Sequence, residues 1–132
     1  MNDESNFNDV LDAALQSRYM AYAPYSKFQV GAAVETTTGA ILAGGNVENS
    51  VYGLGICAER VALAKSVSFG FLEFVRIVIV AHPLASPCGA CRQFMAEFGP
   101  SLEVIAVDAV NLDSRKVWKL AELLPDQFKF DP

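Results

Sequence analysis

The second half of the chain contains two short apolar runs, separated by a segment with a helical pattern. Residues 75–81, "VRIVIVA", are rich in β-branched side chains, and residues 102–107, "LEVIAV", have the same character. Continuous apolar runs are typical of strands that are covered on both faces, as in parallel sheets. Two neighbouring parallel strands need a crossover connection, which is usually a helix. The sequence therefore predicts a strand–helix–strand unit and an α/β fold.

The first half predicts a helix, a hairpin and a second helix. Residues 8–22 carry small or apolar side chains at helical spacing, and Asn8 is a candidate N-cap. Residues 28–36 alternate as a strand does, and residues 41–45 are expected to return beside it. Residues 57–69 are mostly small or apolar, which predicts a largely buried helix.

The composition limits the classes of partner. A chain of 132 residues with 52% hydrophobic and 19% charged residues is expected to form one domain with its own core. Its net charge of −5 argues against nucleic acid, whose phosphates are bound by Lys and Arg. The apolar runs are shorter than the roughly 20 residues that span a bilayer. No apolar run follows basic residues at the N-terminus, so we expect no signal peptide and a cytoplasmic protein.

The three cysteines are the candidate metal ligands. Cys88 and Cys91 form a C-x-x-C pair at the start of a predicted helix over residues 88–98, and Cys57 starts the earlier helix. If the two helix N-termini face one spot, three thiolates meet there, each stabilised by a helix dipole. Zinc takes four ligands, so three thiolates leave one position open, as in catalytic sites. The only histidine, His82, is a weaker candidate for a fourth ligand.

Glu59 indicates what such a site would do. Residues at i and i+2 do not share a helix face, so Cys57 and Glu59 reach one site only if Cys57 occupies the first position of its helix. A carboxyl group placed there can act as an acid or base without binding the metal. The order C-A-E followed by P-C-x-x-C is the pattern of zinc-dependent base deaminases.

From Tyr22 onward, the chain resembles the small homotetrameric cytidine deaminases. The resemblance is carried by "YAPYSKFQVGAA", "GGNVENSVYG", "ICAERVALAKSV", "SPCGACRQ" and "LLPDQF", in the order of the family. It implies a three-layer α/β/α sandwich around a mixed five-stranded sheet, as a single domain over residues 1–132. Residues 1–7 are expected to be a flexible tail. Trp118 lies in a segment that we interpret as a fifth strand, of undetermined direction, or a helical turn.

The resemblance also implies an activity, namely hydrolytic deamination of cytidine and 2′-deoxycytidine in pyrimidine salvage. One zinc ion per subunit would bind to Cys57, Cys88 and Cys91, and Glu59 would carry protons. Asn46 and Glu48 would contact the ribose hydroxyls, and Phe28 would pack on the pyrimidine ring. The backbone at Ala58 would bind the edge of the base. Phe128 would reach the site of a neighbouring subunit. The partners expected are a nucleoside and three further copies of the chain.

Three thiolates on Zn²⁺ leave a net negative charge, which weakens the metal as a Lewis acid. A cation beside the sulfurs would offset that charge. Arg60, next to Glu59, is the expected donor, and the family's arginine at this motif position bonds to the thiolates. Arg92, which follows Cys91, has either a fold-holding or a charge-tuning role.

Three alternatives stay open at this point. A structural zinc module would leave Glu59 without a role. A thiol–disulfide protein would use Cys88 and Cys91 and leave Cys57 as a bystander. A deaminase for another base-bearing substrate, such as blasticidin S, would keep the zinc site and differ in its substrate contacts. A purely structural interpretation of the three cysteines and of Phe28 is that they are buried core residues.

Overall fold

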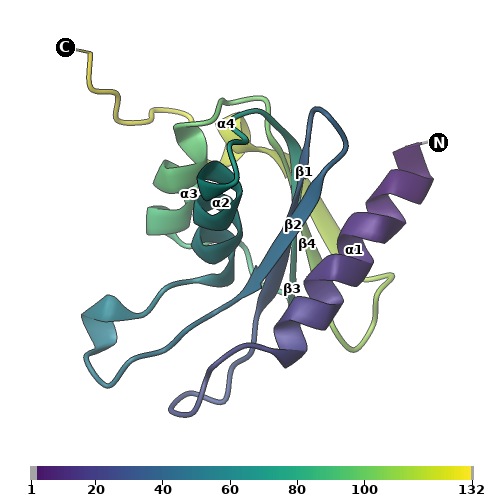
Figure 1. Ribbon diagram of the computed structural model, residues 1–132, viewed down its shortest axis with the longest axis vertical. Coiled ribbons are helices and arrows are strands. Elements are labelled where there is room, and N and C mark those ends of the chain that lie inside the picture. Colours follow the sequence, from purple (N-terminus) through teal and green to yellow (C-terminus); the bar gives the residue numbers. More distant parts are fainter. Residues whose placement is uncertain (1–2, 132) are drawn as a thin grey trace.

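The computed structural model describes residues 3–131, and the side chains of residues 6–131. The helices are α1 (Asp3–Tyr19), α2 (Ala58–Ser68), α3 (Gly89–Ala96) and α4 (Leu120–Leu123), with a short 3₁₀ helix at Tyr52–Leu54. The strands are β1 (Gly31–Thr36), β2 (Ile41–Gly45), β3 (Phe74–Ala81), β4 (Glu103–Asp108) and β5 (Arg115–Lys119). Figure 1 shows α1 on one face of the sheet and α2 and α3 on the other, which confirms the predicted three-layer sandwich.

The five strands lie in the order β2-β1-β3-β4-β5. Only β3 and β4 pair in parallel, with α3 as their crossover, so the predicted strand–helix–strand unit and the mixed sheet are both confirmed. The remaining neighbours pair antiparallel. Trp118 lies on β5 opposite Val104 of β4, which settles the direction of the fifth strand.

Alternating side chains of the central strands supply a core on each face of the sheet. On β3, Ile77 and Ile79 pack beneath α2 and α3, whereas Val78 and Val80 pack beneath α1. Gly31 permits the close approach of α1 to β1, because a Cβ atom at this position would lie 2.0 Å from the carbonyl oxygen of Ala14. Close packing on both faces fixes the carboxyl end of β3, where Ile79 and Ala81 line the site.

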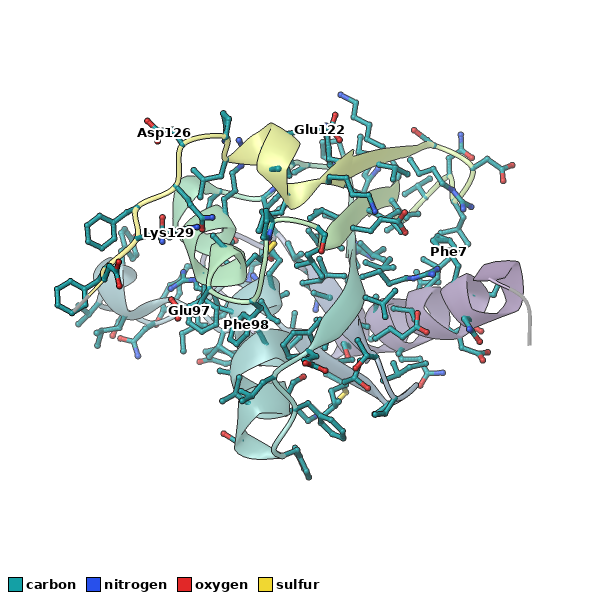
Figure 2. All side chains as sticks on the ribbon, turned by 90° about the horizontal axis from the view of Figure 1, so that it is seen from above. Phe7, Glu97, Phe98, Glu122, Asp126 and Lys129 are labelled. Carbon is teal, nitrogen blue, oxygen red and sulfur yellow. The ribbon has the colours of Figure 1, made fainter. Side chains whose placement is uncertain are left out.

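The N-terminal helix differs from the predicted one. Residues 8–22 were expected to be helical and residues 1–7 to be a tail, but α1 begins at Asp3 and ends at Tyr19. Residues 1 and 2 of the expected tail lie outside the described residues. The physical reason is Phe7, which is only 8% exposed and belongs to the core between α1 and the sheet (Figure 2). The guanidinium of Arg115 lies 4.7 Å above its ring. Asn8 therefore lies within the helix and does not cap it.

In the described part of the chain, every helix is too short or too polar to cross a bilayer.

Candidate active site

Two helix N-termini converge on the cysteines. Cys57 is the N-cap of α2 and Cys88 is the N-cap of α3, and both have extended backbone angles. Cys91 lies in the first turn of α3, where its backbone N–H donates to the Cys88 sulfur over 3.5 Å. Because Cys57 precedes the first helical residue, it and Glu59 line the same cavity despite their i, i+2 spacing.

The three sulfur atoms fit a zinc ion. They all lie within 4.8 Å of one another, and the sulfurs of Cys57 and Cys88 are 3.9 Å apart. Sulfurs at two corners of a tetrahedron with Zn–S bonds of about 2.3 Å lie about 3.8 Å apart. Among the described residues, no other histidine, cysteine or carboxylate joins this group. The donor set and its spacing are those of a three-thiolate zinc site with one open position.

Charge at this cluster is unevenly divided between the thiols. A hydrogen bond from Cys91, helped by Arg60 and opposed by burial, lowers the pKa of Cys57 to about 5. The same hydrogen bond, together with burial, raises the pKa of Cys91, which keeps the shared proton. Arg60 donates from Nη2 to the sulfur of Cys57 over 3.6 Å. The protein thus already stabilises a thiolate at the position that zinc requires.

Glu59 is the second residue of α2 and is only 5% exposed. Its burial is the main reason why its pKa is raised, and the negative charge of Cys57 acts in the same direction. A carboxyl group that is enclosed next to metal ligands, yet is not one of them, is suited to moving protons.

A cavity of about 210 Å³ brings together most of the predicted site. The predicted residues that line it are Phe28, Asn46, Cys57, Ala58, Glu59 and Cys88. The other lining residues, which the sequence pattern did not predict, are Val30, Ile79, Ala81, Ala85 and Ser86. The signal for Ile79 and Ala81 was their place at the carboxyl end of a central strand, where α/β sheets form ligand sites.

Glu48 lines a second cavity, of about 370 Å³, with Tyr25, Ser26 and Tyr52 among its neighbours. Asn46 borders the first cavity and Glu48 the second, so one short segment of chain contributes to both. Asn46 also holds the chain opposite, since its Oδ1 accepts from the Val30 N–H over 2.8 Å and its Nδ2 donates to the Phe28 carbonyl over 3.0 Å.

The remaining candidates lie outside these cavities. His82 contacts Asp108, with 3.0 Å between Nδ1 and Oδ1, and does not approach the sulfurs as a ligand would. Phe128 is 71% exposed in the C-terminal segment, where its carbonyl accepts from Gln93 over 3.1 Å. Figure 2 shows this segment, between Asp126 and Lys129, passing along α3.

Arg92 has a fold-holding arrangement. Its guanidinium donates to the carbonyl of Pro87 over 2.8 Å and to the carbonyl of Leu123 over 3.0 Å, and Nη2 lies 3.3 Å from the hydroxyl of Ser86. These contacts link the turn before Cys88 to α4. The positive charge of the Arg92 guanidinium is therefore directed at oxygen atoms.

Comparison with known proteins agrees with this geometry. Residues 4–107 match the family described as "Cytidine and deoxycytidylate deaminase zinc-binding region". The protein of Dictyostelium discoideum named "Probable cytidine deaminase" is 49% identical over 81% of this chain and 74% of its own length. The cytidine deaminase of Halalkalibacterium halodurans is 43% identical over 90% of this chain and 91% of its own. The crystal structure of cytidine deaminase from Burkholderia pseudomallei superposes with a TM-score of 0.86 and 43% identity, covering 97% of this chain and 100% of that one.

Proposed function

The chain belongs to the cytidine and deoxycytidylate deaminase family, and we propose that it hydrolyses cytidine and 2′-deoxycytidine to uridine and 2′-deoxyuridine, releasing ammonia. The observation that carries this proposal is the cavity in which Phe28 and Glu59 lie beside two of the three clustered cysteines. It has an aromatic wall for a pyrimidine, an enclosed carboxyl group and an open metal position in one place.

The reaction consumes one water for each nucleoside. The water oxygen bonds to C4 of the base, the bond between C4 and the exocyclic nitrogen breaks, and that nitrogen leaves as ammonia. A zinc ion held by the three cysteines supplies the Lewis acidity that makes water nucleophilic near neutral pH. Glu59 takes one proton from the attacking water and passes it to ring N3, and it then takes the second proton from the new hydroxyl group on C4 and delivers it to the leaving nitrogen.

Substrate recognition is divided between the two cavities. The ring of Phe28 packs on the pyrimidine, and the backbone at Ala58 binds the edge of the base. The carboxylate of Glu48 accepts hydrogen bonds from the sugar hydroxyls, and the Asn46 amide contributes to the same grip. The side-chain Oδ1 and Nδ2 of Asn46 are already hydrogen-bonded to the backbone of Val30 and Phe28. Its contact with the sugar therefore uses the second N–H of Nδ2 and the second lone pair of Oδ1.

We further propose a cytoplasmic homotetramer in which neighbouring subunits complete each site. The exposed Phe128 supports this proposal, because its backbone is anchored to Gln93 while its side chain faces outward. The exposed Tyr52 and Leu54 of the 3₁₀ helix offer apolar surface for a neighbour near the second cavity. Light scattering on the purified protein tests the assembly, and a monomer that retains full activity would refute the shared site.

The direct test of the activity is an absorbance assay with cytidine. We expect turnover by the zinc-loaded protein, its loss after chelation, and its return on adding zinc. A protein that binds zinc yet leaves cytidine unchanged would be a structural module. Faster turnover of blasticidin S than of cytidine would reassign the substrate, and activity that does not depend on zinc would refute the proposed chemistry.

A further inference from the structure

The carboxylate of Glu48 is held by the chain segment that leads into β1. Its Oε1 accepts hydrogen bonds from the backbone N–H groups of Tyr25, over 3.0 Å, and Ser26, over 3.1 Å. Its Oε2 accepts a short hydrogen bond from the hydroxyl of Ser26. Three neutral donors therefore fix the plane of this carboxylate, while its other lone pairs face the second cavity.

The same hydroxyl holds the residue that lines the first cavity. The oxygen of Ser26 accepts from the backbone N–H of Phe28 over 3.0 Å, and the carbonyl of Phe28 accepts from Asn46. Ser26 thus donates to one proposed substrate contact and accepts from another. A hydroxyl group can make both bonds at once, whereas alanine makes neither.

The chain between these two bonds is strained. Lys27, between Ser26 and Phe28, has a φ of 63°, in the left-handed region that residues other than glycine rarely adopt. Such conformations persist only where surrounding contacts enforce them, and they cluster at functional sites. The contacts that bridge Lys27 are the bond from the Phe28 N–H to the Ser26 hydroxyl oxygen and the bond from the Lys27 N–H to the Ala23 carbonyl, over 3.1 Å.

The hydrogen bond from the Ser26 hydroxyl to the Glu48 carboxylate also affects the charge of Glu48. This bond is the largest cause of the lowered pKa of the Glu48 carboxyl group, ahead of the two backbone hydrogen bonds and the charge of Lys27. Glu48 therefore stays ionised and accepts hydrogen bonds, as a partner for sugar hydroxyls must.

We propose that Ser26 is a positioning residue for substrate binding, whose one hydroxyl group orients the carboxylate of Glu48 and fixes the backbone that carries Phe28. The inference rests on the proposed function, which assigns Glu48 to the sugar and Phe28 to the base. Ser26 itself acts on the substrate through these two residues.

The test compares Ser26→Ala with Ser26→Thr in the zinc-loaded enzyme, with cytidine as substrate. We expect Ser26→Ala to raise KM about tenfold, as for a lost hydrogen bond to a charged group, and to change kcat much less. Ser26→Thr keeps the hydroxyl and should restore most of the affinity. Ser68→Ala, an exposed serine at the end of α2 and outside both cavities, is the matched control.

A double-mutant cycle shows whether Ser26 acts through Glu48. In a Glu48→Ala background, Ser26→Ala should raise KM only about two- to threefold, because the carboxylate that it orients is absent. The same tenfold rise in both backgrounds, a threonine variant as weak as the alanine variant, or an unchanged KM in Ser26→Ala would overturn the inference. So would a loss of zinc or of thermal stability that accounts for the lost affinity. In each of those cases the wild type still deaminates cytidine, whereas an inactive wild type would refute the proposed function as well.

Discussion

The guanidinium of Arg60 lies against the sulfur of Cys57, with 3.6 Å between Nη2 and Sγ. Both residues belong to the first turn of α2 or its cap, so the helix fixes their relative position. The contact brings a permanent positive charge to a cluster of three thiols and raises the pKa of Arg60 itself. Arg60 is therefore placed to draw negative charge from the sulfurs.

Replacing Arg60 with alanine should slow the reaction. Without this donor the sulfurs carry more negative charge, so the bound metal becomes a weaker Lewis acid, and we expect kcat to fall by about 10- to 100-fold. Steady-state kinetics at matched zinc content measures the effect. Lys116→Ala, which removes an exposed cation on β5, should behave as the wild type does. A wild-type kcat in Arg60→Ala would show that the sulfurs do not need the charge.

Arg92 should prove to be a structural residue. Its guanidinium links the turn at Pro87 to Leu123 near the C-terminus, so Arg92→Ala should lower the free energy of unfolding by about 2 kcal/mol and weaken zinc retention. Arg92→Lys should recover only part of this stability, because one ammonium cannot reproduce the geometry of the guanidinium. Urea unfolding and metal analysis give both quantities. Normal stability combined with slow turnover in Arg92→Ala would instead favour a charge-tuning role.

The packing of α1 on β1 depends on the absence of a side chain at position 31. In Gly31→Ala the new Cβ would lie 2.0 Å from the Ala14 oxygen and 2.6 Å from the Arg18 nitrogen, so the helix must move away from the sheet. We expect the free energy of unfolding to fall by about 3 kcal/mol or more. Gly53→Ala is the control, since no atom lies within 4 Å of its added Cβ. Equal unfolding midpoints for the two variants would contradict this description of the interface.

Ionised Asp108 should contribute its full stability above its usual pKa of 3.8 and lose that contribution as the pH falls below it. The N–H of Val110, 2.8 Å away, and the ring of His82 lower the pKa of this carboxyl group in the folded protein. A carboxyl group with a lowered folded-state pKa contributes stability above its unfolded value and loses it as the pH falls through the folded value. Asp108→Asn should therefore have a lower urea midpoint than the wild type down to about pH 5. The difference between the two midpoints should shrink as the pH falls below the usual pKa.

The exposed Asp126→Asn serves as the control for that series and should match the wild type throughout. A gap that stays constant into the acid range would mean that ionisation of Asp108 does not contribute to stability.

The sequence was most informative where a local pattern determines the structure. The β-branched run of β3 can be buried only in the centre of a sheet, and the Cys57–Glu59 spacing requires an N-cap, so both could be predicted. The start of α1 could not be predicted, because Phe7 is a single apolar residue in an acidic and polar segment, and its burial in the core is visible only in the structure. The direction of β5 was equally inaccessible, since Trp118 is its only partly buried residue and the strand has no apolar face.

The contacts of individual side chains were beyond sequence reasoning where their partners are distant in the chain. Arg92 follows Cys91, a proposed metal ligand, which favoured a charge-tuning role, yet Arg92 bonds to Leu123. Ser26 lies in the motif "YAPYS", where Pro24 explains the end of the preceding helix and a serine is an ordinary turn residue. Only the fold brings its hydroxyl to Glu48.

The central claim is that three sulfurs hold a catalytic zinc and that Glu59 moves the protons. Zinc content and cytidine turnover, measured together on the wild type and on Glu59→Gln, test it most directly. We predict one zinc per chain in both proteins, and conversion of cytidine to uridine by the wild type alone. A glutamine variant that deaminates cytidine at the wild-type rate, or an active wild type that contains no zinc, would contradict the account.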